Sequence, residues 1–171
     1  MTIDIGHHVL GKSAGTIGVG TSEEVCRVAT ALVSQARFGV DIVTRDLDPA
    51  VYDDADFLAA LKAFVLERRR VEVRILVRDP MPAVRRGHRL IPLAQQLSTF
   101  FAIRVPARHH RDFNQAFLVV DGTGYVHREL AERYDGTADF NDRLQAKGLQ
   151  RLFEEMWEAA VPSPELRRMP I

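Results

Sequence analysis

The chain has 171 residues, of which 46% are hydrophobic and 27% charged, proportions typical of one folded domain with a substantial core. Its 23 Lys and Arg residues equal its 23 Asp and Glu residues, so only a local patch could hold a nucleic acid. No apolar run is long enough to cross a bilayer and the first residues lack a signal-peptide pattern, which predicts a cytoplasmic protein without membrane contact. The single cysteine, Cys26, excludes an internal disulfide, and its apolar neighbours predict a buried position.

The first two thirds of the chain predict alternating strands and helices. Spaced glycines make residues 1–15 irregular in our interpretation, and Thr21 with the glutamates that follow is a helix start. Apolar spacing then predicts a strand at 16–19, a helix at 21–38, a strand at 40–44, a helix at 54–68, a strand at 71–77, a helix at 90–97 and a strand at 100–105. The segments 46–49, 80–87 and 104–111 are rich in turn-forming or charged residues and are expected to be turns or loops.

The segment Phe113–Asp121 begins polar, becomes apolar and ends at an aspartate before a glycine, which predicts a buried strand at 115–120 and a turn. A strand at 125–128 would pair with it as a hairpin. After a loop at 134–141, an apolar face predicts a last helix, which prolines end before a tail at 162–171. This order predicts one α/β domain, a three-layer α-β-α arrangement with a mostly parallel sheet and an antiparallel hairpin edge.

Three segments resemble the phospholipase D-like superfamily. In active members each half carries the motif HxKxxxxD, followed by a Gly-Ser-x-Asn stretch and a closing helix. Here Asp121 takes the place of the motif aspartate, Gly136–Phe140 is similar to the Gly-Ser-x-Asn stretch, and LFEEMWEAA at 152–160 is similar to the closing helix. The resemblance covers nearly the whole chain in the order of its elements. It implies that residues 1–171 form a single phospholipase D-like half.

The residues that carry the family's chemistry are replaced at the aligned positions. Asn114 stands where a histidine attacks phosphorus, and Ala116 stands where a lysine holds the phosphate charge. An amide is not a nucleophile and a methyl group supplies no cation. The resemblance therefore implies a non-catalytic binding or regulatory module with no cofactor. Its vestigial site would keep four residues for a ligand: Asn114, Asp121, Thr137 and Asp139. For Asp121 the alternative is a simple turn-forming residue.

The resemblance also implies partners. Active phospholipase D-like proteins build one site from two halves, either within a chain or between two chains. Because this chain resembles one half, we expect a homodimer that joins the regions around Asn114 and 136–141 of both copies. The chain is also similar to a family of uncharacterised bacterial domains, some of which follow a GNAT-type acetyltransferase in the same polypeptide. The expected partners are thus a second copy, an anionic small ligand or an acetyltransferase-type protein, and not a membrane or a nucleic acid.

Arginines supply two candidate anion sites. Arg45 and Arg78 each follow a predicted parallel strand directly, and open α/β sheets bind ligands at the carboxyl ends of their strands. The second cluster lies in the predicted loop RRGHR and consists of Arg85, Arg86 and Arg89, with His88 tuning its charge. Three further arginines would contribute to it: Arg104, Arg108 and Arg111. For both sites the alternative is a solvated surface whose arginines pair with nearby carboxylates.

Two enzyme hypotheses stand beside the binding module. A divergent phosphodiesterase-type hydrolase would use other residues near the vestigial site, such as His109 or His110. Gly6–Ser13 fits the nucleotide-binding pattern GxxxxGK[ST] letter for letter, but a P-loop needs a helix directly after it. Since the following residues AGTIGVG do not start a helix, a P-loop nucleotide binder is the weakest hypothesis. No histidine pair has the spacing of a metal site, so no metal is predicted.

Overall fold

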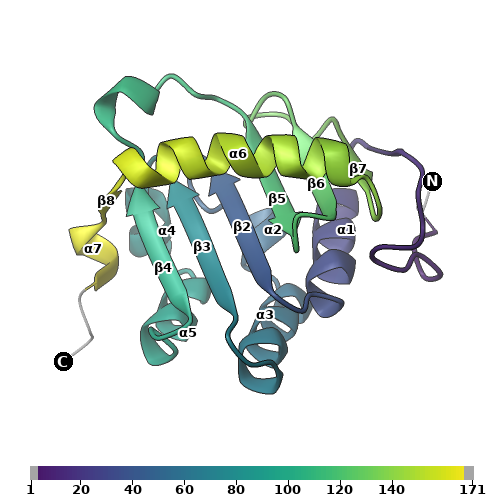
Figure 1. Cartoon of the computed structure of the whole chain (residues 1–171). Coiled ribbons are helices and arrows are strands. Elements are labelled where there is room, and N and C mark those ends of the chain that lie inside the picture. Colours follow the sequence, from purple (N-terminus) through teal and green to yellow (C-terminus); the bar gives the residue numbers. More distant parts are fainter. Residues whose placement is uncertain (1–3, 168–171) are drawn as a thin grey trace.

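The computed structural model describes residues 4–167, which form an eight-stranded sheet with helices on both faces (Figure 1). The order of the strands across the sheet is β1-β7-β6-β5-β2-β3-β4-β8. Their bounds are Ile17–Val19 for β1, Gly39–Thr44 for β2, Glu72–Val77 for β3, Phe101–Val105 for β4, Ala116–Val120 for β5, Gly124–Arg128 for β6, Gly136–Asp139 for β7 and Val161–Pro162 for β8.

The prediction of a mostly parallel sheet is wrong, because the sheet is mixed. Only the pairs β2–β3 and β3–β4 are parallel, and the remaining pairs are antiparallel. Helices connect the parallel strands, whereas β5, β6 and β7 follow one another through shorter connections that reverse the chain. The antiparallel direction of β5 relative to β2 depends on long-range contacts, which no local pattern in the sequence reveals.

The strand β7 occupies a segment that the sequence predicted to be a loop. It pairs with β6 on one side and with β1 on the other. Gly136 makes this pairing possible, since a Cβ atom at this position would collide with the backbone carbonyl of His127. A glycine in a polar segment usually indicates a loop, whereas here it permits the close approach of two strands.

Helices cover the two faces of the sheet unequally (Figure 1). The long helix α6 covers one face of the sheet, and the other helices lie on the opposite face or at the edge of the sheet. The bounds are Ser22–Ser34 for α1, Pro49–Tyr52 for α2, Ala55–Glu67 for α3, Met81–Arg86 for α4, Leu90–Gln96 for α5, Arg143–Ala159 for α6 and Pro164–Arg167 for α7, with a 3₁₀ turn η1 at Arg108–His110. Among the described residues, no helix has the length and apolar character that crossing a bilayer requires.

Local chemistry explains where the helices begin and end. Thr21 accepts a hydrogen bond from the backbone N–H of Glu24 at 3.1 Å, which confirms the predicted start of α1. The short helix α4 falls in the segment 80–87 that was predicted as a loop, and α2 begins at Pro49, the last residue of the predicted turn. Their prolines lie in the first helical turn, where the missing N–H does no harm, and Gly87 ends α4 in a left-handed conformation with φ of 68°.

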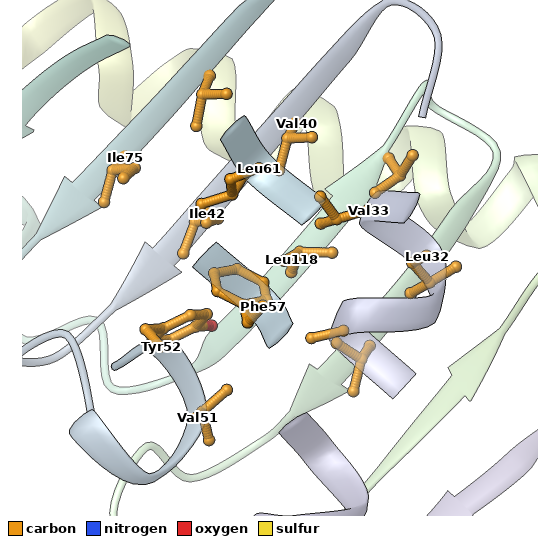
Figure 2. Packing of buried hydrophobic residues seen from close by; sticks show 14 of the residues in the cluster. Leu32, Val33, Val40, Ile42, Val51, Tyr52, Phe57, Leu61, Ile75 and Leu118 are labelled. Carbon is orange, nitrogen blue, oxygen red and sulfur yellow. The ribbon is translucent and has the colours of Figure 1, made fainter. Parts of the chain in front are cut away.

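The main hydrophobic core lies between the sheet and the helices α1, α2 and α3 (Figure 2). Leu32 of α1, Phe57 and Leu61 of α3, and Ile42 and Ile75 of the parallel strands are fully buried there. Cys26 is buried as predicted, and burial raises the pKa of its thiol to about 11. The thiol therefore stays protonated at neutral pH and acts as a small hydrophobic group.

A smaller core fills the space between α6 and the sheet. Phe153 and Trp157 lie one turn apart on α6 and stack with a ring distance of 5.4 Å, which confirms the predicted apolar face of the closing helix. The guanidinium of Arg74 lies 4.8 Å from the ring centre of Phe153 and pairs with the carboxylate of Asp41 at 2.8 Å. Beyond α6, the predicted tail contains β8, which pairs with β4, and the short helix α7.

Candidate functional site

The four vestigial-site residues do not gather at one place. Asn114 precedes β5 and Asp121 follows it, so the two are roughly 23 Å apart along the strand at about 3.3 Å per residue. Thr137 is in register with His127, and Asp139 is in register with Tyr125, which places both two strands away from β5. Asn114 and Asp121 therefore lie at opposite ends of strand β5, and Thr137 and Asp139 lie on β7.

Asp121 holds the connection between α1 and β2. Its carboxylate accepts hydrogen bonds from the backbone N–H groups of Arg37 at 2.9 Å, Phe38 at 2.8 Å and Gly39 at 3.0 Å. Its own backbone has φ of 57°, a conformation that aspartate tolerates better than most residues. These contacts account for an aspartate at this position without any part in catalysis.

Asp139 and Thr137 differ in their surroundings. The buried carboxylate of Asp139 accepts hydrogen bonds from the backbone N–H of Asn141 at 2.9 Å and of Gly15 at 3.3 Å. It thereby ties the N-terminal segment to the end of β7. Thr137 is exposed at the surface. Asp139 is thus engaged in the fold, and the exposed Thr137 interacts through its side chain with Tyr125 of the neighbouring strand.

Asn114 is covered by the loop at 129–135, which joins β6 to β7. Its side-chain Nδ2 donates a hydrogen bond to Glu132 at 2.7 Å, and its backbone carbonyl oxygen accepts one from the backbone N–H of Ala131 at 2.8 Å. The hydrogen bond from Asn114 lowers the pKa of the Glu132 carboxyl, and the nearby charges of Arg45 and Arg78 add to this effect.

The buried guanidinium of Arg128 holds this loop in place through hydrogen bonds to its backbone. Its Nη1 donates hydrogen bonds to the backbone oxygens of Arg133 at 3.1 Å and Ala131 at 3.4 Å. The guanidinium lies 3.9 Å from the carboxylate of Asp48 and 5.3 Å from the ring centre of Tyr134. A buried cation with these partners gives the loop one fixed position over Asn114.

Arg45 and Arg78 do converge at the ends of β2 and β3, whose arrowheads lie side by side in Figure 1. Together with His110 and Asn114 they line a cavity of about 10 Å³. The atoms His110 Nδ1 and Asn114 Oδ1 are shielded from solvent and have no hydrogen-bond partner among the described residues. A space of this size holds about one water molecule, so a phosphoryl group does not fit.

The position that aligns with the family's lysine is also inaccessible to a ligand. Ala116 is 1% exposed and pairs with Arg128 in the sheet. On the neighbouring strand, His127 Nε2 donates a hydrogen bond to the side-chain oxygen of Gln115 at 2.7 Å, and burial lowers the pKa of the His127 imidazole. His127 was not singled out in the sequence, since a lone histidine in a strand carries no motif. Of the two histidines proposed for a divergent hydrolase, His110 lines the small cavity and His109 is exposed.

The second arginine cluster does not line this cavity. Arg89 pairs with Asp53 at 2.6 Å, as expected for the salt-bridge alternative. The prediction that His88 tunes an exposed loop is wrong, because the ring is buried. Its Nε2 donates to the carbonyl of Leu47 at 2.9 Å, its Nδ1 accepts from the backbone N–H of Leu90 at 3.1 Å, and burial lowers its pKa. Arg85 and Arg86 lie exposed in the last turn of α4.

A larger cavity, of about 610 Å³, lies at the opposite edge of the sheet beside Asp121. Four basic residues from distant segments line it: Lys12, Arg37, Arg68 and Arg143. No spacing in the sequence connects residues so far apart, so this set could not be predicted from the sequence. Lys12 belongs to the Gly6–Ser13 segment, which forms turns and is followed by β1 rather than by a helix.

Comparison with solved structures relates this geometry to known folds. The chain matches TrmBL2, an archaeal chromatin protein with a novel mode of DNA binding, with a TM-score of 0.63 and 14% identity, over 86% of this chain and 54% of that one. It matches Nuc from Salmonella typhimurium, a phospholipase D family member, with a TM-score of 0.62 and 12% identity over 88% and 98% of the two chains. NucT from Helicobacter pylori follows with a TM-score of 0.59 and 12% identity over 88% and 99%.

These likenesses show that the chain has a phospholipase D-like fold, and at such low identity they show the fold alone. The chain spans about half of the TrmBL2 chain but almost all of Nuc and NucT. A comparison with curated protein sequences finds no match. A family model matches residues 21–169, which is most of the chain, and the protein therefore belongs to the family described as Domain of unknown function (DUF7931).

Proposed function

We propose that this protein is a non-catalytic phospholipase D-like module that binds an anionic, phosphate-bearing ligand. The observation that carries the proposal is the replacement of the family's nucleophile and phosphate-holding lysine by Asn114 and Ala116. The closed cavity beside Asn114 supports it, since a cavity of about 10 Å³ admits no substrate phosphate. A phosphate-bearing ligand is favoured because the fold neighbours include a DNA-binding chromatin protein and phospholipase D family members.

The alternative of a divergent hydrolase rests on His110. This histidine lines the small cavity together with Arg45 and Arg78, so a base and two cations lie near one another. The loop at 129–135 would have to leave Asn114 before a substrate could reach them. Its hydrogen bonds to Asn114 and its attachment to Arg128 oppose that movement.

We expect the purified protein to show no hydrolysis of bis-p-nitrophenyl phosphate or of single-stranded DNA above the buffer rate. The reason is the lack of an activated nucleophile at the aligned position. The measurement is release of nitrophenolate, with a gel assay for DNA. Turnover that disappears in His110→Ala but persists in the control His109→Ala would contradict the proposal and establish the divergent hydrolase.

We also expect a homodimer, because the family completes its site from two halves. The face that would meet a second copy includes the exposed residues Leu130, at 43% exposure, and Thr137. Phe140 does not suit a test of this interface, since its side chain is fully buried in the core of its own chain. A charge at the exposed Leu130 tests the contact instead.

Light scattering behind a sizing column is expected to give twice the mass of the chain for the wild type and for Leu66→Asp. Leu66 is 56% exposed and lies in the last turn of α3, outside the proposed contact. Leu130→Asp is expected to give the monomer mass. A wild-type monomer at high micromolar concentration would contradict the dimer and leave this face free for another protein, such as an acetyltransferase-type partner.

A further inference from the structure

The lining of the cavity beside Asp121 is strongly basic, although the molecule as a whole has no net charge. Its lining contains Lys12, Arg37, Arg68 and Arg143 against a single carboxylate, that of Asp121. The full chain has equal numbers of basic and acidic residues. We refer to these four cations and the adjacent Phe38 as the basic pocket.

The charges of the basic pocket are not balanced by the protein itself. The ion pairs among the described residues involve other arginines, and none of the four cations takes part in one. The carboxylate of Asp121 is already bonded to three backbone N–H groups. Four unpaired cations around one hollow repel each other, and an anionic ligand would relieve that repulsion.

The walls of the basic pocket are held in place by the fold. Asp121 fixes the backbone of Arg37 and Phe38. On the other side, the turn that carries Lys12 is anchored by hydrogen bonds from Gly11 to the carbonyl of Phe140 at 2.8 Å and from Leu10 to the side chain of Gln35 at 2.8 Å. The cations are therefore presented from rigid backbone, which reduces the entropy lost on binding.

Phe38 adds a feature that a simple phosphate site does not need. Its ring is 71% exposed at the rim of the pocket. Proteins that bind single-stranded nucleic acids combine a basic groove for the backbone with exposed aromatic rings on which bases stack. A duplex offers no free base face to such a ring, because its bases already stack on one another.

We propose that the basic pocket binds single-stranded nucleic acid, with backbone phosphates against the four cations and one base stacked on Phe38. This inference rests on the proposed function and names both its ligand and its location. The ligand site lies at the edge of the sheet opposite to Asn114, so binding would not involve the place where the family performs its chemistry.

The test is fluorescence anisotropy with a labelled oligothymidylate of about 12 nucleotides. With four phosphate contacts, the slope of log K against log salt concentration is expected to be about −2.8. Arg143→Gln and Lys12→Gln should each weaken binding and reduce this slope by about 0.7. Phe38→Ala should weaken binding by about fivefold or more and leave the slope unchanged. The matched control is Arg151→Gln, which removes an exposed arginine of α6 outside the pocket and should change neither quantity.

Other outcomes separate this inference from the proposed function. Binding that is lost in Arg78→Gln but unaffected in the pocket variants would overturn the inference and leave the anion-binding module intact. Equal affinity for a duplex of the same length, or Phe38-dependent binding to phosphatidylglycerol vesicles without oligonucleotide binding, would also overturn it. Cleavage of the oligonucleotide by the wild type would instead overturn the non-catalytic function.

Discussion

Replacing Trp157 with alanine is expected to lower the free energy of unfolding by about 3–5 kcal/mol. The indole is 7% exposed and stacks on Phe153 at 5.4 Å. The guanidinium of Arg104 lies 4.2 Å from the Trp157 ring centre and donates a hydrogen bond to the Trp157 carbonyl. Because the side chains of α6 form the core on this face of the sheet, loss of this ring leaves a cavity between the helix and the strands.

Urea unfolding followed by circular dichroism measures this change. The control is Leu144→Ala on the same helix, which removes a side chain that is 85% exposed and should change stability by about 0.5 kcal/mol or less. Since domains of this size are stable by about 5–15 kcal/mol, the Trp157 variant should express poorly or unfold at low urea. A midpoint close to that of the wild type would mean that α6 is peripheral to the fold.

Asp121→Ala is expected to cost about 3 kcal/mol of stability. The substitution leaves the backbone N–H groups of residues 37–39 without their acceptor and places alanine at φ of 57°. The two effects add, because hydrogen bonds to a charged acceptor are stronger than neutral ones and alanine disfavours the left-handed region.

Asp121→Asn is the matched variant for this effect. Asparagine tolerates the left-handed conformation and keeps one acceptor oxygen, so thermal unfolding should place it between the wild type and Asp121→Ala. Equal stability of all three proteins would contradict the structural role of Asp121 described above.

The missing chemistry of the vestigial site could be predicted from the sequence, because it depends on residue types alone. Asn114 and Ala116 carry no nucleophile and no cation in any fold. The convergence of Arg45 and Arg78 could also be predicted, since parallel neighbouring strands end at one edge of a sheet. The closure of the cavity between them could not, because it depends on a distant loop that the buried Arg128 holds in place.

Most local elements of this protein could be predicted from short stretches of its sequence. The helices α1, α3 and α6 and the strands β2, β3, β5 and β6 lie where apolar spacing and capping residues predicted them, because those signals act over one or two turns of chain. The direction of β5, the strand at 136–139 and the assembly of the basic pocket depend on contacts between distant segments. Lys12, Arg37, Arg68 and Arg143 meet because four separate segments pack at one edge of the sheet, and such packing is a property of the whole chain.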